Sequence, residues 1–338
     1  MRPLLAGTPT LATLAAALDG TGPALLTDSS PHVVAALRPQ DGVDDDVAVV
    51  VPTSGSTGVP KGVLLTAEAL LASANAALER LGGPGRWLLA IPPTHVGGLQ
   101  VLVRSLVAGL DPVVLPPGPF TATSLDGVSG CRYTSLVPTQ LGRLRPGALE
   151  AFEAVLLGGA AAPPGLPPNV VPTYGMSETS GGCVYDGVPL PGVEVDVRER
   201  VRLRGPTLAA GYRDGAPLLD ADGWFTTGDV GALVDGRLVV HGRADDVVVT
   251  GGEKVAPAAV EAALLTHPDV REVAVVGAPD PEWGQRVVAH VVGDVTLEQA
   301  REWVAERLGR VAAPRELRRW DALPQLANGK VDRVGLSR

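Results

Sequence analysis

The chain contains little cysteine, no long apolar run and no excess of positive charge, and each absence argues against a class of protein. Its two cysteines, Cys131 and Cys183, lack the spacing of a metal site, so we expect unreactive thiols in a reducing cytoplasm. No apolar run reaches about 18 residues, the length that a membrane span requires. The net charge of −9 argues against a nucleic-acid partner. Small anionic ligands stay open, because local hydrogen-bond donors can hold them despite the overall charge.

What is present is a globular composition. Hydrophobic residues make up 45% and charged residues 19% of a chain of 338, which is long enough for about two domains. The apolar segment Leu11–Leu18 follows a single basic residue, Arg2, and ends at Asp19. This pattern favours an amphipathic first helix over a signal peptide.

The order of the apolar segments predicts an α/β fold. Up to about Val184 expected strands alternate with expected helices, which predicts a large N-terminal domain with a mostly parallel, buried sheet. Short strands with turns then predict a β-rich subdomain. From about Arg243 the pattern changes again, with helices expected at residues 257–265 and 297–308, and predicts a small α+β domain. We therefore expect domains at residues 1–242 and 243–338.

A hydroxyl- and glycine-rich stretch follows the first strongly apolar strand, expected at residues 47–51. Glycines let several backbone N–H groups converge, hydroxyls add donors and a lysine adds a positive charge, which together favour phosphate binding. The spacing does not fit the Walker loop, because Pro60 stands where the second glycine would be and Gly62 where a hydroxyl would bind magnesium. The candidate phosphate ligands are Thr53, Ser54, Gly55, Ser56, Thr57, Gly58 and Lys61.

The pattern T-S-G-S-T-G-V-P-K-G-V in this stretch resembles the signature of the adenylate-forming superfamily, which comprises acyl-CoA ligases, carrier-loading adenylation domains and luciferases. Each further match alone has a simple structural explanation, such as a turn, but the matches occur in the order that the superfamily requires. They are P-P-T-H-V-G-G at residues 92–98, G-G-A at 158–160, Y-G-M-S-E-T at 174–179, T-G-D at 227–229, G-R-A-D-D at 242–246, the glycine pair at 251–252 and N-G-K-V-D-R at 328–333.

The resemblance implies a role for each matching residue. Gly159 and Ala160 lie against adenine, while Tyr174, Gly175, Met176 and Ser177 contact the nucleotide, with Ser177 replacing the usual threonine. Glu178 holds Mg²⁺, Asp229 and Arg243 bind the ribose, and Asp245 is the hinge of the small domain. Gly251 and Gly252 line the pantetheine tunnel for coenzyme A, His95 belongs to the acyl pocket, and Lys330 contacts the carboxylate and the α-phosphate.

The implied activity has two half-reactions. A carboxylic acid attacks the α-phosphate of ATP, releasing pyrophosphate and leaving an acyl adenylate. The small domain is mobile in this family, and its rotation at Asp245 withdraws Lys330 and admits a thiol along Gly251 and Gly252. We therefore expect ATP, Mg²⁺ and coenzyme A as ligands, together with a small carboxylic acid.

Within the superfamily, the stretch S-L-V-P-T-Q-L at residues 135–141 resembles the o-succinylbenzoate–CoA ligases of menaquinone biosynthesis. Arg104, nine residues after His95, is similarly placed, and its guanidinium suits the second carboxylate of that substrate. The alternative for Arg104 is an exposed residue on the helix after the loop. The alternatives for the whole chain are another aryl- or acyl-CoA ligase, a stand-alone adenylation domain that loads a carrier protein, and a non-enzymatic homologue.

One departure from the family concerns the N-terminal region. The phosphate loop begins about fifty residues into the chain, much earlier than is usual, so we expect a large part of the leading subdomain to be absent. A shorter wall of the acyl pocket and a homodimer that compensates for the lost core are both open.

Overall fold

The structure is a computed structural model that describes residues 1–54, 59–325 and 331–337. It divides into two compact units. Unit 1 comprises Met1–Gly159, Pro167–Asp196 and Arg202–Thr226, and unit 2 comprises Ala160–Leu166, Val197–Val201 and Thr227–Arg338. Residues 227–242 thus belong to unit 2, whereas the sequence analysis placed them in the first domain. The domain boundary at residue 243 stays a prediction.

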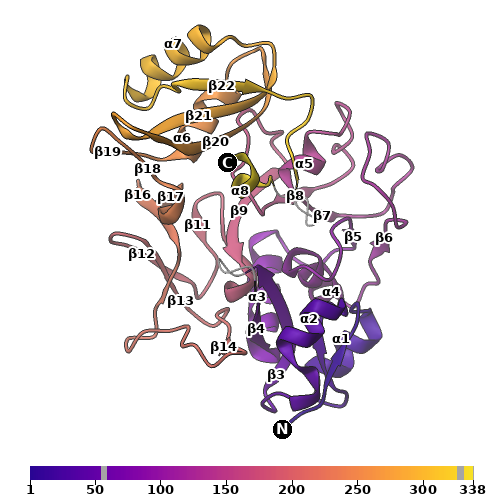
Figure 1. Ribbon diagram of the computed structural model, residues 1–338. Coiled ribbons are helices and arrows are strands. Elements are labelled where there is room, and N and C mark those ends of the chain that lie inside the picture. Colours follow the sequence, from indigo (N-terminus) through magenta and orange to yellow (C-terminus); the bar gives the residue numbers. More distant parts are fainter. Residues whose placement is uncertain (55–58, 326–330, 338) are drawn as a thin grey trace. The chain divides into compact units, whose positions relative to one another are not determined.

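Unit 1 begins with a five-stranded sheet in the order β1-β2-β3-β4-β14 (Figure 1). Its first three strands pair in parallel, and β4 and β14 are antiparallel to their neighbours. A β-branched run, Val47–Val51, forms the buried centre of this sheet, as expected for residues that pack well on a pleated surface. The strands are β1 (Leu4–Ala6), β2 (Ala24–Leu26), β3 (Val47–Ser54), β4 (Pro60–Thr66) and β14 (Gly211–Tyr212).

A second sheet of unit 1 has seven strands in the order β11-β10-β9-β8-β7-β5-β6. The strands from β6 to β9 pair in parallel, which confirms the predicted mostly parallel sheet, and β10 and β11 add an antiparallel edge. The strands are β5 (Trp87–Leu89), β6 (Val113–Val114), β7 (Tyr133–Leu136), β8 (Ala154–Leu157), β9 (Val170–Met176), β10 (Gly181–Tyr185) and β11 (Val188–Pro189).

Helices α3 (Ala67–Arg80) and α4 (Val96–Ala108) pack against each other and join the two sheets of unit 1. Helix α3 contacts β3 and β4 of the first sheet and β10 of the second, while α4 contacts β5, β7 and β10. The hydroxyl of Thr66 caps α3 by accepting from the backbone N–H of Ala69. The other helical segments of unit 1 are α1 (Leu11–Leu18), α2 (Pro31–Leu37), η1 (Pro39–Asp41), α5 (Pro138–Leu141) and η2 (Ser177–Thr179).

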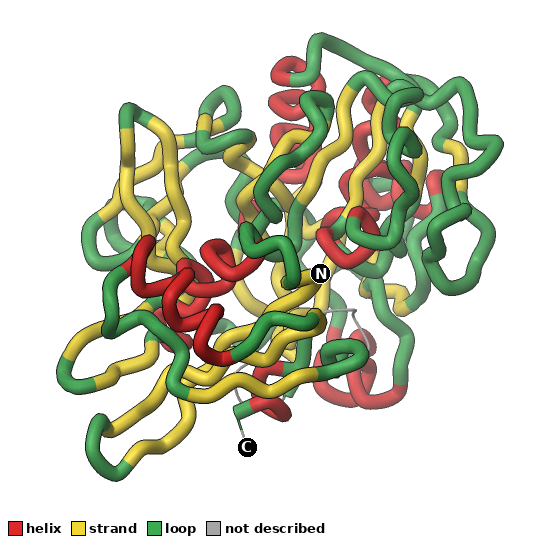
Figure 2. The backbone as a smooth tube through the Cα atoms, turned by 90° about the horizontal axis from the view of Figure 1, so that it is seen from above, coloured by secondary structure: helices red, strands yellow, loops and turns green. Residues whose placement is uncertain are grey.

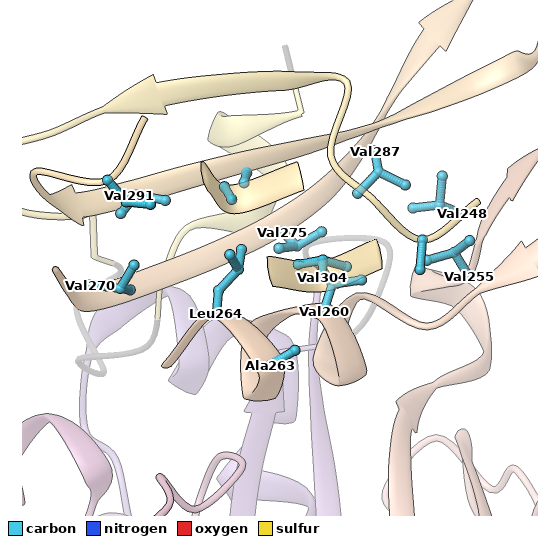
Figure 3. Close-up of a cluster of buried hydrophobic side chains, with 14 residues drawn as sticks. Val248, Val255, Val260, Ala263, Leu264, Val270, Val275, Val287, Val291 and Val304 are labelled. Carbon is cyan, nitrogen blue, oxygen red and sulfur yellow. The ribbon is translucent and has the colours of Figure 1, made fainter. Parts of the chain in front are cut away.

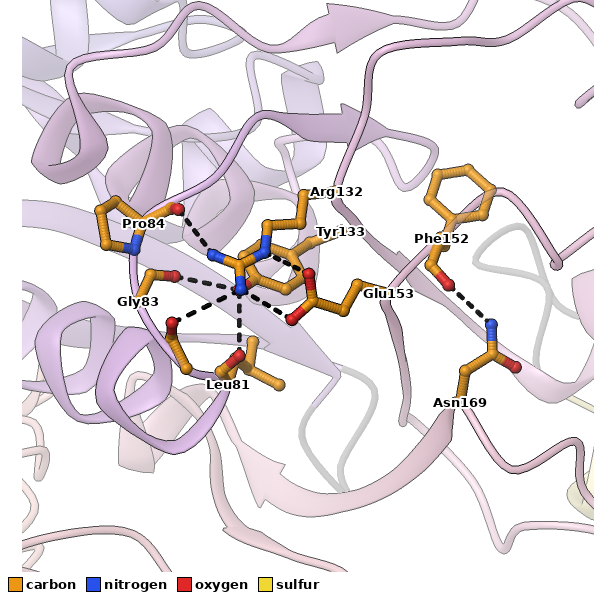
Figure 4. Close-up of polar contacts among 9 residues, drawn as sticks. Leu81, Gly83, Pro84, Arg132, Tyr133, Phe152, Glu153 and Asn169 are labelled. Atoms are coloured by element: carbon orange, nitrogen blue, oxygen red, sulfur yellow. Dashed lines mark hydrogen bonds and ion pairs between the residues drawn. The ribbon is translucent and has the colours of Figure 1, made fainter.

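A polar clamp ties strands β7 and β8 to the turn after α3 (Figure 4). Arg132 donates from Nε and Nη2 to the two carboxylate oxygens of Glu153, at 2.5 and 2.6 Å, and from Nη1 to the carbonyl of Pro84. The hydroxyl of Tyr133 donates to the carbonyls of Leu81 and Gly83. The clamp fixes the N-terminal ends of β7 and β8, two inner strands of the seven-stranded sheet.

In sequence, residues 194–243 lie between the strands of the seven-stranded sheet and those of the C-terminal sheet, and they form short strands. A three-stranded sheet has the order β12-β13-β15 and a hairpin joins β16 to β17, which agrees with the expected β-rich region. Loops and turns, green in Figure 2, connect these short elements. The strands are β12 (Glu194–Val197), β13 (Val201–Arg204), β15 (Phe225–Thr226), β16 (Asp229–Val234) and β17 (Arg237–Arg243).

The C-terminal part of unit 2 is a sheet in the order β19-β18-β21-β20, with β22 parallel to β21. Side chains alternate between its faces as the strand period of two requires. Val275 packs with helices α6 and α7 (Figure 3). Its neighbours Ala274 and Val276 pack with α8 on the other face. The elements are η3 (Ala244–Asp246), β18 (Val248–Thr250), β19 (Glu253–Val255), α6 (Pro257–Leu265), β20 (Val270–Asp280), β21 (Gly284–Gly293), α7 (Leu297–Leu308), β22 (Glu316–Arg319) and α8 (Arg333–Leu336).

The phosphate-loop stretch joins antiparallel strands β3 and β4, because the apolar residues of β4 complete the first sheet. Helix α4 begins at Val96, directly after the candidate acyl-pocket residue His95. The segment Tyr174–Met176 lies inside strand β9. Among the described residues, no helix is long and apolar enough to cross a membrane.

Candidate active site

The β3–β4 hairpin positions the first group of candidate residues. Thr53 pairs with Lys61 across the ladder and Ser54 with Pro60, and the hydroxyl of Thr53 donates to the carbonyl of Lys61 at 3.4 Å. Four candidate phosphate ligands, Gly55, Ser56, Thr57 and Gly58, lie outside the described residues. The strand ladder therefore holds the described residues on both sides of this stretch.

Strand β14 brings a residue that the sequence analysis missed, Tyr212, beside two predicted ones. Its hydroxyl donates to Glu178 Oε1 at 3.0 Å, and Lys61 Nζ lies 5.5 Å from the centre of its ring. Burial, and then the nearby Glu178 carboxylate, raise the pKa of Tyr212, so the phenol stays protonated and remains a donor. Tyr212 pairs with Val63 of β4, which is why these residues meet.

The end of β9 turns sharply into the 3₁₀ helix η2, which carries Ser177 and Glu178. The hydroxyl of Thr179 accepts from the Met176 N–H at 2.9 Å and donates to the carbonyl of Gly181 at 2.6 Å. Gly175 has no room for a side chain, because a Cβ there would lie 2.1 Å from the Gly181 carbonyl oxygen. Tyr174, Gly175, Met176, Ser177 and Glu178 are all half-buried, so each keeps some access to a ligand. Gly159 and Ala160 follow strand β8 and are exposed.

The predicted ribose ligands meet in unit 2, where Asp229 and Arg243 are cross-strand partners of the β16–β17 hairpin. Arg243 Nη1 lies 3.8 Å from Asp229 Oδ1, and the Asp229 side chain is largely buried. Gly228 allows this approach, because a Cβ there would lie 2.6 Å from the Arg243 guanidinium carbon. Asp245, the predicted hinge, is exposed in η3. Its Oδ2 lies 3.9 Å from Arg243 Nη2, and its Oδ1 lies 3.9 Å from Arg200 Nη2.

The glycines expected to line the pantetheine tunnel form the turn between β18 and β19. Gly251 and Gly252 are exposed and adopt positive φ angles of 58° and 83°. The Gly251 N–H donates to the carbonyl of Trp283 at 2.9 Å, which holds the turn against the residue that directly precedes strand β21. Lys330, the predicted catalytic lysine, lies outside the described residues together with residues 326–329, whereas Gln325 and Val331 are described.

His95 is the N-cap residue of α4 and is exposed. The loop before it is fixed by Thr27, whose buried hydroxyl donates to the carbonyl of Thr94 at 2.9 Å. Asp28 lies nearby: burial raises its pKa, but the Ser30 N–H and the charges of His32 and His95 lower it further, so the net shift is downward. The imidazole of His95 therefore has a carboxylate in its surroundings.

Arg104 is buried, so the alternative that it is an exposed residue on the helix after the loop is wrong. Its side chain is only 3% exposed, its guanidinium carbon lies 4.9 Å from the centre of the Trp87 ring, and Nη2 donates to the Tyr185 hydroxyl at 3.2 Å. Burial raises the pKa of Tyr185 despite the nearby Arg104, so this partner is neutral. Among the described residues, Arg104 Nε has no hydrogen-bond partner. Burying a cation beside neutral groups costs free energy, and an anionic ligand that pairs with the cation would offset this cost.

The oxygens of Glu178 fit Mg²⁺ in the way that nucleotide enzymes bind it. Among residues 1–54, 59–325 and 331–337, no group of three metal-binding side chains could enclose an ion on its own. Mg²⁺ commonly takes one or two carboxylates and completes its shell with water and phosphate oxygens. Tyr212 bonds to Oε1 of Glu178, which orients the carboxylate and leaves Oε2 for such a contact.

Comparison with known families agrees with this arrangement. Residues 7–212 match the family model of the AMP-binding enzymes, and residues 259–330 match that of the AMP-binding enzyme C-terminal domain. The first match covers more than half of the chain and includes the β3–β4 hairpin, η2 and Tyr212. The chain belongs to the AMP-binding enzyme family.

Individual relatives narrow the comparison. The probable 2-succinylbenzoate–CoA ligase of Mycobacterium tuberculosis (strain CDC 1551 / Oshkosh) is 51% identical, with 95% of this chain and 92% of the relative covered. The o-succinylbenzoate CoA synthetase (MenE) from Bacillus subtilis, solved with the acyl-adenylate intermediate OSB-AMP, is 28% identical at a TM-score of 0.74 and covers 97% of this chain and 81% of its own. The amide bond synthetase McbA from Marinactinospora thermotolerans is 28% identical at a TM-score of 0.80, with coverage of 99% and 79%.

Proposed function

We propose that this chain is an ATP-dependent 2-succinylbenzoate–CoA ligase of menaquinone biosynthesis. It converts the acid and ATP to an acyl adenylate and pyrophosphate, and then transfers the acyl group to coenzyme A with release of AMP. The observation that carries the proposal is the 51% identity over 95% of this chain to a relative with that name.

The first half-reaction brings an anionic carboxylate to an anionic α-phosphate, so the site has to neutralise both. Lys61 and the backbone N–H groups of the stretch 54–58 suit the phosphates, and Lys330 suits the α-phosphate and the attacking carboxylate. Glu178 would hold Mg²⁺, which would supply further neutralisation of phosphate charge when bound. Asp229 offers two acceptor oxygens to the ribose hydroxyls, and Arg243 lies beside it.

The second half-reaction needs the thiol of coenzyme A at the acyl carbonyl after pyrophosphate has left. We assign Gly251 and Gly252 to the pantetheine path. Nothing lies within 4 Å of where a Cβ on Gly252 would be, so a narrow ligand can pass close to the backbone there, while the Trp283 ring fills the corresponding space at Gly251. Rotation of residues 243–338 about Asp245 would exchange Lys330 for this turn, so that one pocket serves both half-reactions. His95, exposed at the start of α4, is assigned to the acyl pocket.

The substrate carries a second carboxylate that does not react. Arg104 supports this substrate because its guanidinium is buried, faces the neutral Tyr185 hydroxyl and has a free Nε among the described residues. A guanidinium fork matches a carboxylate in two hydrogen bonds. We assign Arg104 to the recognition of the aromatic carboxylate.

A second candidate function is an adenylating ligase with another acceptor. The similarity to the amide bond synthetase McbA favours it, since an amine in place of the thiol would use the same first half-reaction. A carrier-protein thiol is the other alternative acceptor. A homodimer stays a prediction, which light scattering on the purified protein tests.

The deciding experiment is a pyrophosphate-release assay on the purified chain with 2-succinylbenzoate, benzoate, a fatty acid and no acid. We expect release only with 2-succinylbenzoate, together with 2-succinylbenzoyl-CoA when coenzyme A is present. Product analysis with coenzyme A, a simple amine and a phosphopantetheinyl carrier distinguishes the acceptors. Pyrophosphate release with a different acid, but not with 2-succinylbenzoate, would contradict the assignment.

A further inference from the structure

We propose that Glu261 and Arg333 form a positioning pair that holds the segment immediately after Lys330 in place for adenylation. This inference rests on the proposed function, because the catalytic role of Lys330 comes from it. Neither residue touches substrate in our account: both act through the lysine.

The pair is a two-point ion pair between helix α6 and helix α8. Arg333 Nη1 lies 2.6 Å from Glu261 Oε1, and Nη2 donates to Oε2 at 2.9 Å. Strand β20 completes the arrangement, since the Val275 N–H donates to Oε1 at 2.6 Å and Arg333 Nη1 donates to the Val275 carbonyl at 2.9 Å. Glu261 is only 7% exposed. One guanidinium thus locks a helix, a strand and the C-terminal segment together.

The chain on both sides of residues 326–330 is also fixed. Gln325 and Val331 form an antiparallel bridge, and the Asp332 N–H donates to the carbonyl of Pro324 at 2.9 Å. Leu336 of α8 is buried against the face of β20 opposite to α6. Lys330 directly precedes Val331 in the chain, and Arg333 follows two residues after Val331. The pair therefore holds the described segment that begins immediately after the lysine.

The pair is better explained by positioning than by stability. A buried ion pair pays a desolvation cost that can exceed its attraction, and apolar residues of similar volume often stabilise a fold as well. Here the carboxylate, the guanidinium and the Val275 backbone satisfy one another, which specifies a single geometry. Burial lowers the pKa of Arg333, but Glu261 and then Asp246 raise it further, so the guanidinium stays charged. Asp246 belongs to η3, next to the proposed hinge.

The test compares the two half-reactions in Glu261→Gln and Arg333→Lys. Glu261→Gln keeps the volume and the acceptor for Val275 but removes the charge, while Arg333→Lys keeps the charge and loses the fork. The matched control is Glu316→Gln, which removes a carboxylate paired with Arg286 and Arg318 in the same unit. Adenylation is measured as pyrophosphate release, thioester formation is measured from supplied 2-succinylbenzoyl adenylate, and the melting temperature is recorded for each variant.

We expect Glu261→Gln to reduce adenylation at least tenfold and thioester formation less than twofold, with Arg333→Lys in between and Glu316→Gln equal to wild type in both. Equal losses in both half-reactions, or no loss in adenylation, would overturn the positioning role. Failure of the proposed function looks different: the wild type itself would release no pyrophosphate with 2-succinylbenzoate, or Lys330→Ala would adenylate normally. If Glu261→Gln melts below the assay temperature, the ratio of half-reactions in Arg333→Lys decides.

Discussion

The two units hold their candidate site residues in different ways. In unit 1 the backbone sets the positions: Lys61 and Tyr212 lie on neighbouring strands of one sheet, and Glu178 meets Tyr212 where η2 follows β9. In unit 2 the ladder of the β16–β17 hairpin likewise places Asp229 opposite Arg243, but the segment that follows Lys330 is held by side chains, through the Glu261–Arg333 ion pair. Removing one side chain should therefore change the geometry most around that ion pair.

This difference matches the work that each unit does in the proposed cycle. In that proposal the AMP part of the nucleotide stays bound through both half-reactions, which suits a rigid ladder. Lys330 is proposed to serve only the first half-reaction, so its support is local to the unit that carries it. Arg104 is an exception in unit 1, because it is a buried cation whose position depends on Trp87 and Tyr185 instead of on a strand.

The largest expected effect comes from Lys330→Ala. Losing a charge-assisted contact that forms mainly in the transition state should cost about 4 kcal/mol, or roughly a thousandfold in adenylation. Thioester formation from supplied acyl adenylate should stay within about twofold of wild type, because the lysine has been withdrawn by then. Single-turnover assays of each half-reaction check this. Equal losses in the two assays would contradict the division of labour between the units.

Arg104→Leu should have the next largest effect. It strands the second carboxylate of 2-succinylbenzoate without its cation, which should cost about 3 kcal/mol, on the order of a hundredfold in kcat/KM for the diacid. The control is a 4-aryl-4-oxobutanoate without the aromatic carboxylate, tested at one temperature in both proteins. It should lose much less, because it has no second charge to leave unpaired. Similar losses for both acids would show that Arg104 only supports the packing of α4.

Much of the fold could be read from the sequence because its patterns are local. Helices α6 and α7 have the expected bounds, since their start signals are local: Pro257 stands at the start of α6, and the hydroxyl of Thr296 caps α7. Strand β4 was missed because Pro60-Lys61-Gly62 resembles a loop, and only its pairing with β3 makes it a strand. Tyr212 was missed for the same reason: a two-residue strand has no pattern, and its position depends on a partner about 150 residues earlier.

Sequence motifs predicted site residues without their surroundings. Asp229 and Arg243 were both expected to bind the ribose, and the hairpin register places them opposite each other. The burial of Arg104 could not be predicted, because one arginine in an apolar helix has no local signal for what covers it. Trp87 and Tyr185, which enclose it, come from strands at different places in the sheet.

A smaller effect is expected for Tyr212→Phe, which removes the hydroxyl that orients Glu178 and keeps the ring beneath Lys61. A half-exposed hydrogen bond to a carboxylate contributes about 1 kcal/mol, so adenylation should fall roughly fivefold, with a higher Mg²⁺ requirement. Tyr212→Leu serves as the matched variant, because it also removes the ring and should lose more. A Tyr212→Phe protein with wild-type rate and Mg²⁺ dependence would remove the tyrosine from the site.

The smallest effect concerns the stability of unit 2 in mild acid. His290 of β21 is fully buried, and its Nδ1 accepts from Trp320 Nε1 at 3.0 Å, while its Nε2 has no partner among the described residues. Burial and the charge of Arg318 lower the pKa of His290, and Glu316 only partly opposes them. The folded protein therefore binds this proton less readily than the unfolded chain, whose histidine titrates near about 6.5. Stability from the neutral imidazole is complete above that pH and is lost as the pH falls toward the lower folded pKa.

Between pH 7 and 5 the melting temperature should fall by a few degrees in the wild type and by less in His290→Gln. The control His241→Gln changes an exposed histidine and should follow the wild type. Parallel curves for all three proteins would mean that the acid sensitivity of unit 2 lies elsewhere.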